Sequence, residues 1–331
     1  MAPMRPTECR DVGRRRFIAI AGAFGGTALL PTVTQATAEL HHWRGVALGA
    51  RASIRLLHPD PAEAHRIIDL AVQEIERLEA IFSLYRGDSA LAVLNRDGRL
   101  PDPPLELVEL LSRAREVSRL SGGAFDVTVQ PLWQRYRDHF ATHAGTALPA
   151  VADLLPLVDW RALRIDPTEV ALTRSGMAVT LNGIAQGFVT DRVHDLLRRN
   201  GIGQVLLDLG EIRAAGDRGD GRPWHVGIAD PGNPDRSLRR LDCVDRAIAT
   251  SGGYGTVFDR GYRYSHLIDP RNGRTAPVLR GTTVTAPDAT TADAWSTAFA
   301  LMTRQEVVEI APLIGDMKVY FATMGSVAQI A

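Results

Sequence analysis

The segment spanning residues 247–302 holds several side chains that could support chemistry. Asp293 and Thr297 stand four residues apart where a helix is predicted to begin, so their oxygen atoms share one helix face. Oxygen ligands of this kind suit a hard cation such as Mg²⁺. His266 precedes Asp269 and Pro270 in a pattern that predicts a strand running into a turn, and a neutral histidine can accept a proton. The segment therefore predicts an oxygen-ligand metal site with a base nearby.

Each of these residues also has a simpler structural interpretation. Asp293 could be a helix N-terminal charge favoured by the helix dipole, which contributes about 0.3–1 kcal/mol. The Thr297 hydroxyl could donate to the carbonyl four residues earlier, and His266 could bond to a neighbouring backbone carbonyl. The residue pattern alone leaves both interpretations open.

A second glycine-rich block covers residues 180–216, where Gly183 and Gly187 frame the start of a predicted amphipathic helix. Free N–H groups at such a helix start can bind a pyrophosphate, although a tight connection explains the glycines equally well. The G-x-G-x-x-G spacing is absent and strands do not alternate regularly with helices, so a Rossmann dinucleotide fold is excluded.

A third block, residues 121–133, places Gly122 and Gly123 before a predicted short strand that carries Asp126. A charge in such an apolar run is expected to be paired or to face a ligand, whereas a glycine cap before a surface strand is the alternative. Around these blocks the patterns predict an opening strand (44–57), amphipathic helices (61–82 and 104–120), a small antiparallel meander (163–182) and strands near 205–209 and 224–230. Pattern alone indicates a mixed α and β protein.

Composition narrows the function classes. The formal net charge of the 331 residues is zero, which removes the electrostatic basis for nucleic-acid binding. Lys318 is the only lysine, which argues against P-loop or Schiff-base chemistry. Cys9 and Cys243 are the only cysteines, so we predict no disulfide framework and a buried apolar thiol at Cys243.

The first 38 residues resemble a twin-arginine export signal. Arg14 to Arg16 precede an apolar run from Phe17 to Leu30 that is too short to span a membrane, and Ala36-Thr37-Ala38 offers a small-residue cleavage site. An uncleaved anchor is the alternative interpretation. We expect an exported, periplasmic and mildly acidic mature chain that forms one domain over residues 39–331.

Seven segments, taken together and in order, resemble the ApbE family of FAD:protein FMN transferases. They span most of the chain after the signal and read FSLYRGDSALAVLN, GGAFDVTVQPLW, LNGIAQGFVTD, DLGEIRAAG, AIATSGGYG, SHLIDPRNG and VTAPDATTADAWSTAFALM. The resemblance implies an α+β fold of two related α/β lobes, with mainly antiparallel sheets and the flavin site between the lobes.

The resemblance also implies roles for individual residues. The metal ligands would be Asp293, Thr297 and the backbone carbonyl of Gly183, with Ser296 near the same ion. His266 would activate the acceptor hydroxyl, and Asp293 would serve catalysis through the metal. The implied cofactor-binding residues are Tyr85, Ala124, Phe125, Asp126, Thr180, Gln186 and Ile268.

This chain departs from the family pattern at two of these positions. Many members have D-L-G-G-I-A-K-G where this sequence reads T-L-N-G-I-A-Q-G, so Thr180 replaces an acid and Gln186 replaces a lysine. An uncharged amide must therefore hydrogen-bond where a positive charge is usual. The lipid-modified cysteine of many members is also absent, so a soluble exported form is expected. Arg271 and Arg274 flank the following turn, and a solvated surface position is favoured for them over phosphate contact.

The implied reaction is Mg²⁺-dependent transfer of FMN from FAD to a threonine hydroxyl of a target flavoprotein, with release of AMP. The implied partner is a membrane-bound respiratory flavoprotein. Two rival functions remain at this stage: a periplasmic FAD carrier without transferase activity, and a Mg²⁺-dependent FAD pyrophosphatase that gives FMN and AMP.

Overall fold

An eight-stranded antiparallel sheet organises the computed structural model, which describes residues 38–142, 148–259 and 261–331. The predicted export signal lies outside these residues except for Ala38. Along the sheet the strand order is β1-β2-β6-β7-β10-β11-β12-β13, and smaller sheets pair β3-β5-β4 and β8-β9. The strands are β1 (Glu39–Ala47), β2 (Ala50–His58), β3 (Arg99–Pro101), β4 (Leu163–Ile165), β5 (Glu169–Leu172), β6 (Val205–Asp208), β7 (Ile212–Ala215), β8 (Trp224–Asp230), β9 (Asn233–Cys243), β10 (Ala247–Gly252), β11 (Gly281–Ala286), β12 (Lys318–Thr323) and β13 (Ser326–Gln329). The α-helices are α1 (Pro61–Phe82), α2 (Ala90–Asp97), α3 (Leu105–Leu120), α4 (Gln130–Thr142), α5 (Ala185–Arg199), α6 (Ala289–Ala300) and α7 (Arg304–Ile314).

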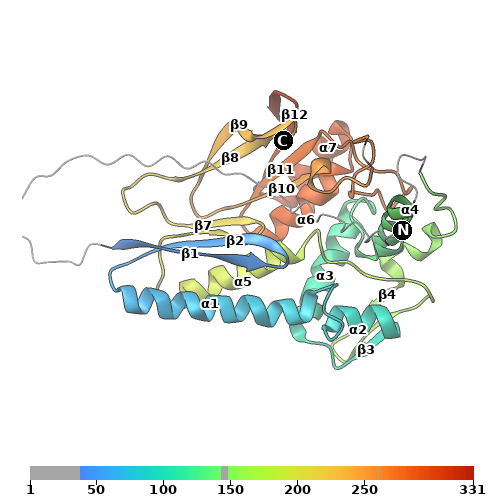
Figure 1. Ribbon diagram of the computed structural model, residues 1–331, viewed down its shortest axis with the longest axis horizontal. Helices are drawn as coiled ribbons and strands as arrows, with labels where there is room; N and C mark the ends of the chain where they lie inside the picture. Colours follow the sequence, from blue (N-terminus) through green and yellow to red (C-terminus); the bar gives the residue numbers. More distant parts are fainter. Residues whose placement is uncertain (1–37, 143–147, 260) are drawn as a thin grey trace, which may run out of the picture.

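The molecule has three layers, with helices on one face of the large sheet and the β8–β9 hairpin on the other (Figure 1). Successive side chains along each strand point to opposite faces of the sheet, so each strand contributes residues both to the core under the helices and to the core under the β8–β9 hairpin. In β6, Val205 and Leu207 join the core with α1 and α5, whereas Leu206 packs with Trp224 and Val226 of β8. Helices and antiparallel sheets together confirm the predicted α+β fold class.

Helix α1 covers the residues predicted for it because every local signal agrees. Asp60 caps its first turn by accepting from the N–H groups of Ala62 and Glu63, and Pro61 occupies the first helical position. Its inward face, which includes Ile67, Ile75 and Leu78, is buried against the sheet. The predicted second helix is also confirmed, as α3.

Three local predictions are wrong. Residues 44–57 form two strands, because Leu48 and Gly49 make a two-residue turn with positive φ at both positions. The predicted short strand after Gly123 is instead a 3₁₀ turn, Val127–Val129, running into α4; its β-branched residues favoured the wrong element. The meander at 163–182 keeps the β4–β5 hairpin, but its third strand is the distant β3.

The predicted helix start near Asp293 is also wrong. Helix α6 begins at Ala289, where Asp288 caps it by accepting from the Thr291 N–H. Asp293 therefore lies in the second turn and Thr297 in the third. This position removes the simpler interpretation of Asp293 as a helix N-terminal charge, because the dipole effect is confined to the first turn.

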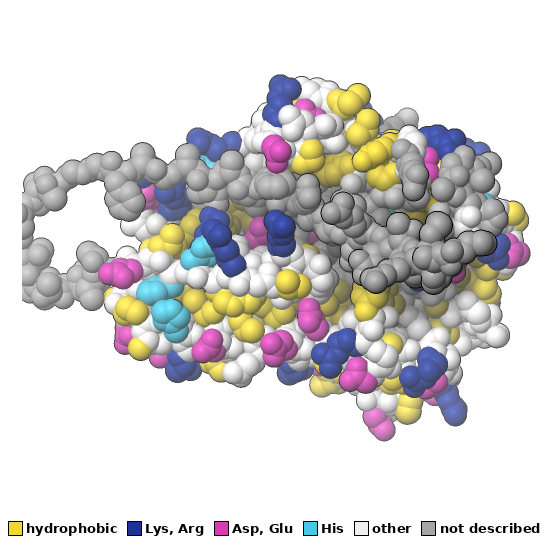
Figure 2. All heavy atoms as spheres, viewed as in Figure 1, with side chains coloured by type: hydrophobic (Ala, Val, Ile, Leu, Met, Phe, Trp, Pro, Cys, Tyr) yellow, Lys and Arg dark blue, Asp and Glu magenta, His cyan; other side chains and the backbone are white. Residues whose placement is uncertain are grey.

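Acidic and basic side chains are interspersed on the part of the surface that Figure 2 leaves uncovered. Within the part of the chain that the structure describes, no helix is long and apolar enough to cross a membrane. Cys243 is fully buried as predicted, and this burial raises the pKa of its thiol to about 12.

Candidate active site

A cavity of 470 Å³ opens where the loop before α5, the strand β10 and the helix α6 converge. Its polar wall includes Thr180, Asn182, Thr250, Ser251 and Asp293. Its apolar wall comes from α4 and the 3₁₀ turn before it, from the segment between β10 and β11, and from the end of α6: Val129, Trp133, Tyr254, Leu267, Ile268, Leu279 and Leu301. One half can thus accept a flat apolar group and the other a polar one.

Helices α5 and α6 cross closely at one edge of this cavity, and the crossing depends on Gly187. A Cβ atom at this position would lie 2.2 Å from the carbonyl oxygen of Ala289 and 2.8 Å from Cβ of Asp293. The glycine therefore lets the Asp293 side chain reach α5, where Oδ2 accepts from the Gly187 N–H at 2.9 Å. The close approach of the helices requires glycine at position 187. The backbone conformation does not, because the φ of Gly187 is not positive.

This bond also caps the start of α5. The helix begins at Ala185 after the N-cap residue Ile184, so Gly187 is its third residue and the Gly187 N–H has no acceptor within the helix. The Asp293 carboxylate supplies that acceptor, and Gly183 lies just before the helix, outside its hydrogen-bond pattern. Gly183 itself packs against α6, because a Cβ atom there would lie 3.0 Å from Thr297 Oγ1 and 3.3 Å from the Phe125 ring. The structure therefore brings together the three predicted metal ligands.

The hydroxyl of Thr297 points across to the sheet. Its Oγ1 lies 3.0 Å from Ser251 Oγ on β10, and Ser251 Oγ lies 2.8 Å from Ser296 Oγ. The Ser296 hydroxyl donates to the carbonyl oxygen of Asp293 at 3.0 Å. The simpler interpretation of Thr297 therefore fails, because its hydroxyl contacts Ser251 and the neighbouring Ser296 bonds to that carbonyl.

The first turn of α6 is held by a buried carboxylate of α5. Asp191 accepts from the backbone N–H groups of Ala289 and Thr290, each at 2.8 Å, and forms an ion pair with Arg213 of β7 at 2.5 Å. Because Gly187 and Asp191 lie one turn apart on α5, two adjacent turns of that helix fix the position of Asp293. Burial raises the pKa of Asp191, and the Arg213 charge opposes that shift.

His266 lines the cavity in a bend between two isolated β-bridges, and not in the strand that the sequence predicted. Its Nδ1 lies 3.0 Å from the Thr256 carbonyl oxygen and 3.2 Å from the Thr256 N–H. The surrounding loop packs on α4 through aromatic side chains, and the Tyr136 hydroxyl donates to the carbonyl of Gly273 at 2.6 Å. Helix α4 thereby holds the histidine loop over the cavity.

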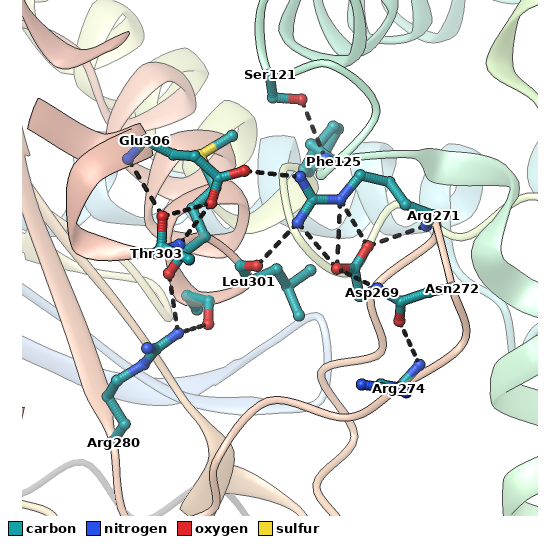
Figure 3. Close-up of polar contacts among 12 residues, drawn as sticks. Ser121, Phe125, Asp269, Arg271, Asn272, Arg274, Arg280, Leu301, Thr303 and Glu306 are labelled. Carbon is teal, nitrogen blue, oxygen red and sulfur yellow. Dashed lines mark hydrogen bonds and ion pairs between the residues drawn. The ribbon is translucent and has the colours of Figure 1, made fainter. Parts of the chain in front are cut away.

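Two arginines fasten the same region to the C-terminal end of α6 (Figure 3). Arg271 donates to Asp269 within its own turn, to the Leu301 carbonyl at 3.1 Å and to Glu306 of α7 at 3.1 Å. Arg280 donates to the carbonyl oxygens of Ala300 and Met302. Cations at the C-terminal end of a helix donate to its last carbonyl oxygens and interact favourably with the negative end of the helix dipole. Arg271 is exposed, in agreement with the preference for a solvated surface position, and it also links its loop to the end of α6 and to α7.

Comparison with known proteins decides the family. The model of the ApbE family matches residues 48–321 of this chain. This chain belongs to the ApbE family. A Treponema pallidum protein named FAD:protein FMN transferase is 31% identical over 275 residues, which cover 76% of each chain. A Vibrio cholerae protein of the same name is 30% identical and covers 83% of this chain and 85% of its own.

Solved structures agree with the fold. The ApbE protein of Thermotoga maritima superposes with a TM-score of 0.77 at 25% identity, covering 88% of this chain and 97% of its own. A flavin transferase ApbE of Vibrio cholerae gives 0.75 at 27% identity, with 88% and 96% covered. The family, the fold class and the enzyme class predicted from the sequence are thereby confirmed.

The cofactor-binding residues implied by the ApbE resemblance fall into two groups. Thr180, Gln186 and Ile268 line the cavity. The others do not: Ala124 and Phe125 are buried in the core, Asp126 is a buried cap, and Tyr85 is 83% exposed in the loop after α1. These four positions stay predictions of the resemblance.

The buried carboxylate of Asp126 holds backbone in place. Its Oδ1 accepts from the N–H and hydroxyl of Thr128, and its Oδ2 accepts from the Trp160 N–H at 3.0 Å. Burial raises the pKa of Asp126. The neighbouring Val127 carbonyl accepts from the Thr180 N–H at 2.8 Å, so this turn positions the cavity wall. The expectation that Asp126 would be paired or face a ligand is met by its hydrogen bonds to Thr128 and Trp160.

Sequence reasoning missed several cavity residues, among them Ser251 and Glu211. Ser251 was overlooked because a serine next to Gly252 and Gly253 reads as a turn, and its partners lie 45 and 46 residues away along the chain. Glu211, 1% exposed at the turn between β6 and β7, also lines the cavity. The only signal in the sequence was that Glu211 follows a predicted strand and Gly210. The local pattern does not show that this acidic side chain is buried.

Proposed function

We propose that this chain transfers the FMN part of FAD to a threonine hydroxyl of a target protein, with Mg²⁺ bound, and releases AMP. The observation that carries the proposal is the convergence of Gly183, Asp293 and Thr297 in one cavity with His266. The names of the relatives support flavin transfer, and the three oxygen donors support the metal.

The residues present fit a magnesium ion. Asp293 is 3% exposed, its Oδ2 accepts from the Gly187 N–H, and its side chain shares the cavity with the Thr297 hydroxyl. No cluster of three His, Cys, Asp or Glu residues suited to a metal occurs among the described residues, so Asp293 would be joined by neutral oxygens. Mg²⁺ accepts such a shell, completed by water and phosphate oxygens. The ion would supply Lewis-acid polarisation of the phosphoryl group when bound.

The chain's own residues would position the two reactants. The apolar wall with Trp133, Tyr254 and Ile268 suits the flat ring system, and Thr180, Asn182 and Gln186 present polar groups beside the metal ligands. Such a displacement depends mainly on orientation and charge neutralisation. Gln186 would hydrogen-bond through its amide at the position where many family members carry a lysine.

His266 would take the proton of the acceptor. Nδ1 lies near both the carbonyl and the N–H of Thr256, and in the tautomer whose Nδ1–H donates to that carbonyl, Nε2 would accept the proton. The threonine oxygen then forms a bond to the FMN phosphorus, the anhydride P–O bond breaks, and its electron pair leaves with AMP. Atoms and charge balance without an oxidant or reductant.

We further propose that the chain is exported by the twin-arginine signal and acts in the periplasm on a membrane-bound respiratory flavoprotein. The arginine pair, the short apolar run and the Ala-x-Ala ending support export. Fractionation of cells that express the chain with Arg14 and Arg15 changed to Lys tests this step. Export that continues unchanged contradicts it.

One assay tests transfer against its two rivals. The protein is incubated with FAD, Mg²⁺ and an FMN-acceptor domain, and the acceptor is then weighed by mass spectrometry. We expect a mass gain of one FMN, which is lost in Asp293→Ala and when a chelator removes Mg²⁺. An unchanged acceptor with intact FAD would indicate a carrier, and free FMN with AMP would indicate a pyrophosphatase.

A further inference from the structure

Three hydroxyl groups form a chain beneath the cavity. It runs from Thr297 Oγ1 to Ser251 Oγ (3.0 Å), from there to Ser296 Oγ (2.8 Å), and ends at the carbonyl oxygen of Asp293 (3.0 Å). Ser296 is fully buried, and Ser251 and Thr297 are partly buried at the cavity wall. The chain starts and ends on residues that hold the proposed cation.

The terminal carbonyl fixes the direction of every bond in this chain. A carbonyl oxygen can only accept, so the single proton of the Ser296 hydroxyl is committed to Asp293. Ser296 must then accept from Ser251, whose proton is used in that bond. Ser251 can therefore only accept from Thr297, so the Thr297 hydroxyl donates its proton away from the cavity.

This direction matters for metal binding. A threonine hydroxyl binds a cation through a lone pair, and its proton must point elsewhere. We propose that Ser251 and Ser296 are positioning residues that hold the Thr297 hydroxyl with its lone pairs available to the cation. The role of Ser296 is then to terminate the hydroxyl chain, whereas the resemblance implied that it lies near the ion. The proposal rests on the cation site described above.

The chain offers a matched control in Thr282. It stands opposite Ser251 in the register of β10 and β11, and its hydroxyl oxygen is buried with no hydrogen-bond partner among the described residues. Thr282→Val removes a buried hydroxyl of the same sheet region at nearly constant volume while leaving the three-hydroxyl chain intact.

The test measures binding of Mn²⁺, as a spectroscopic substitute for Mg²⁺, by electron paramagnetic resonance in the presence of FAD. We expect Ser251→Ala to raise the Mn²⁺ dissociation constant about 10- to 100-fold, as is usual when a residue that orients a ligand is lost. Ser251→Thr, which keeps a hydroxyl, should restore binding to within about threefold, and Thr282→Val should match the unmodified protein. Ser296→Ala should have a smaller effect than Ser251→Ala, because Ser251 keeps its oxygen as an acceptor for Thr297.

A double variant separates this role from a general loss of packing. On a Thr297→Val background the hydroxyl chain has nothing to orient, so adding Ser251→Ala should weaken Mn²⁺ binding no further. The proposal would be overturned if Ser251→Ala weakened Mn²⁺ binding on the Thr297→Val background as much as it does alone. It would also be overturned if Ser251→Ala bound Mn²⁺ as tightly as Thr282→Val does. If Ser251→Ala does not fold, an Mn²⁺ affinity of Ser296→Ala equal to that of the unmodified protein would overturn it. Because the measurement is cation binding, a failure of FMN transfer with these affinities intact would contradict only the proposed function.

Discussion

The Gly187 N–H and the Asp293 carboxylate meet at 2.9 Å although 106 residues separate them in the chain. This bond joins α5 to α6 and gives the N–H of the third residue of α5 an acceptor that the helix itself cannot supply. One contact therefore holds the Asp293 carboxylate against the first turn of α5, in the cavity that Gly183 and Thr297 also line. The proposed cation site depends on this crossing more than on either helix alone.

Gly187→Ala should destabilise the protein because the added methyl group would lie 2.2 Å from the Ala289 carbonyl oxygen. Overpacking of this kind costs about 1–3 kcal/mol in the free energy of unfolding. Urea unfolding followed by circular dichroism measures it. Gly203→Ala is the matched control, since its Cβ would meet only the end of Arg198 at 3.9 Å. Equal midpoints for the two variants would contradict the steric account.

His266→Ala should slow FMN transfer about 10²- to 10⁴-fold, the usual contribution of a positioned general base. Binding of FAD should change little, because the proposed base acts on the acceptor. Single-turnover transfer and FAD fluorescence titration separate the two effects. His225→Ala is the control, because that histidine contacts Asp242 on the β8–β9 hairpin and lies outside the cavity. A loss of FAD binding equal to the loss of rate would argue against the role of a base.

Glu306→Gln should reduce stability at neutral pH and have little effect in acid. The Thr303 N–H donates to Glu306 at 2.7 Å, and this bond, together with Arg271, lowers the pKa of the Glu306 carboxyl from its ordinary value of 4.5. A depressed pKa stabilises the fold above the unfolded pKa, and that contribution is lost as the pH falls through the folded pKa. The melting temperatures of the variant and the original protein should therefore differ at pH 7 and converge as the pH falls below 4.5 and through the lowered pKa of the folded state.

Glu309→Gln is the control for this experiment, since Glu309 is an exposed residue of the same helix whose side chain contacts Gln305. Its melting temperature should stay close to that of the original protein across this pH range. A difference for Glu306→Gln that grew in acid would have the wrong sign for a carboxylate with a lowered pKa.

Cys243 should resist alkylation in the folded protein. Burial raises the pKa of its thiol to about 12, so only about one molecule in 10⁴ carries a thiolate at pH 8. Iodoacetamide labelling of a Cys9→Ser variant, followed by mass spectrometry, should show slow modification in buffer and complete modification in denaturant. Rapid labelling under native conditions would show that the thiol is accessible.

Seven ordered segments were sufficient to predict the family from the sequence, whereas the metal ligands that the resemblance implies, Asp293 and Thr297 among them, stay predictions. Helix α1 was predicted residue for residue because its cap, its proline and its apolar spacing are local signals. Local signals misled where β-branched residues after Asp126 form a helical turn, and where Leu48 and Gly49 make a hairpin turn without the usual residues.

Only the tertiary structure decided which simpler interpretations fail. It placed Asp293 one turn inside α6, turned the Thr297 hydroxyl toward Ser251 and made Arg271 part of the link between a loop and the end of α6. The sequence determined which oxygen-bearing side chains are present at Ser251, Asp293 and Thr297. Their arrangement came from contacts between elements distant in the sequence, because hydrogen-bond partners and close helix crossings depend on packing that local residue patterns do not encode.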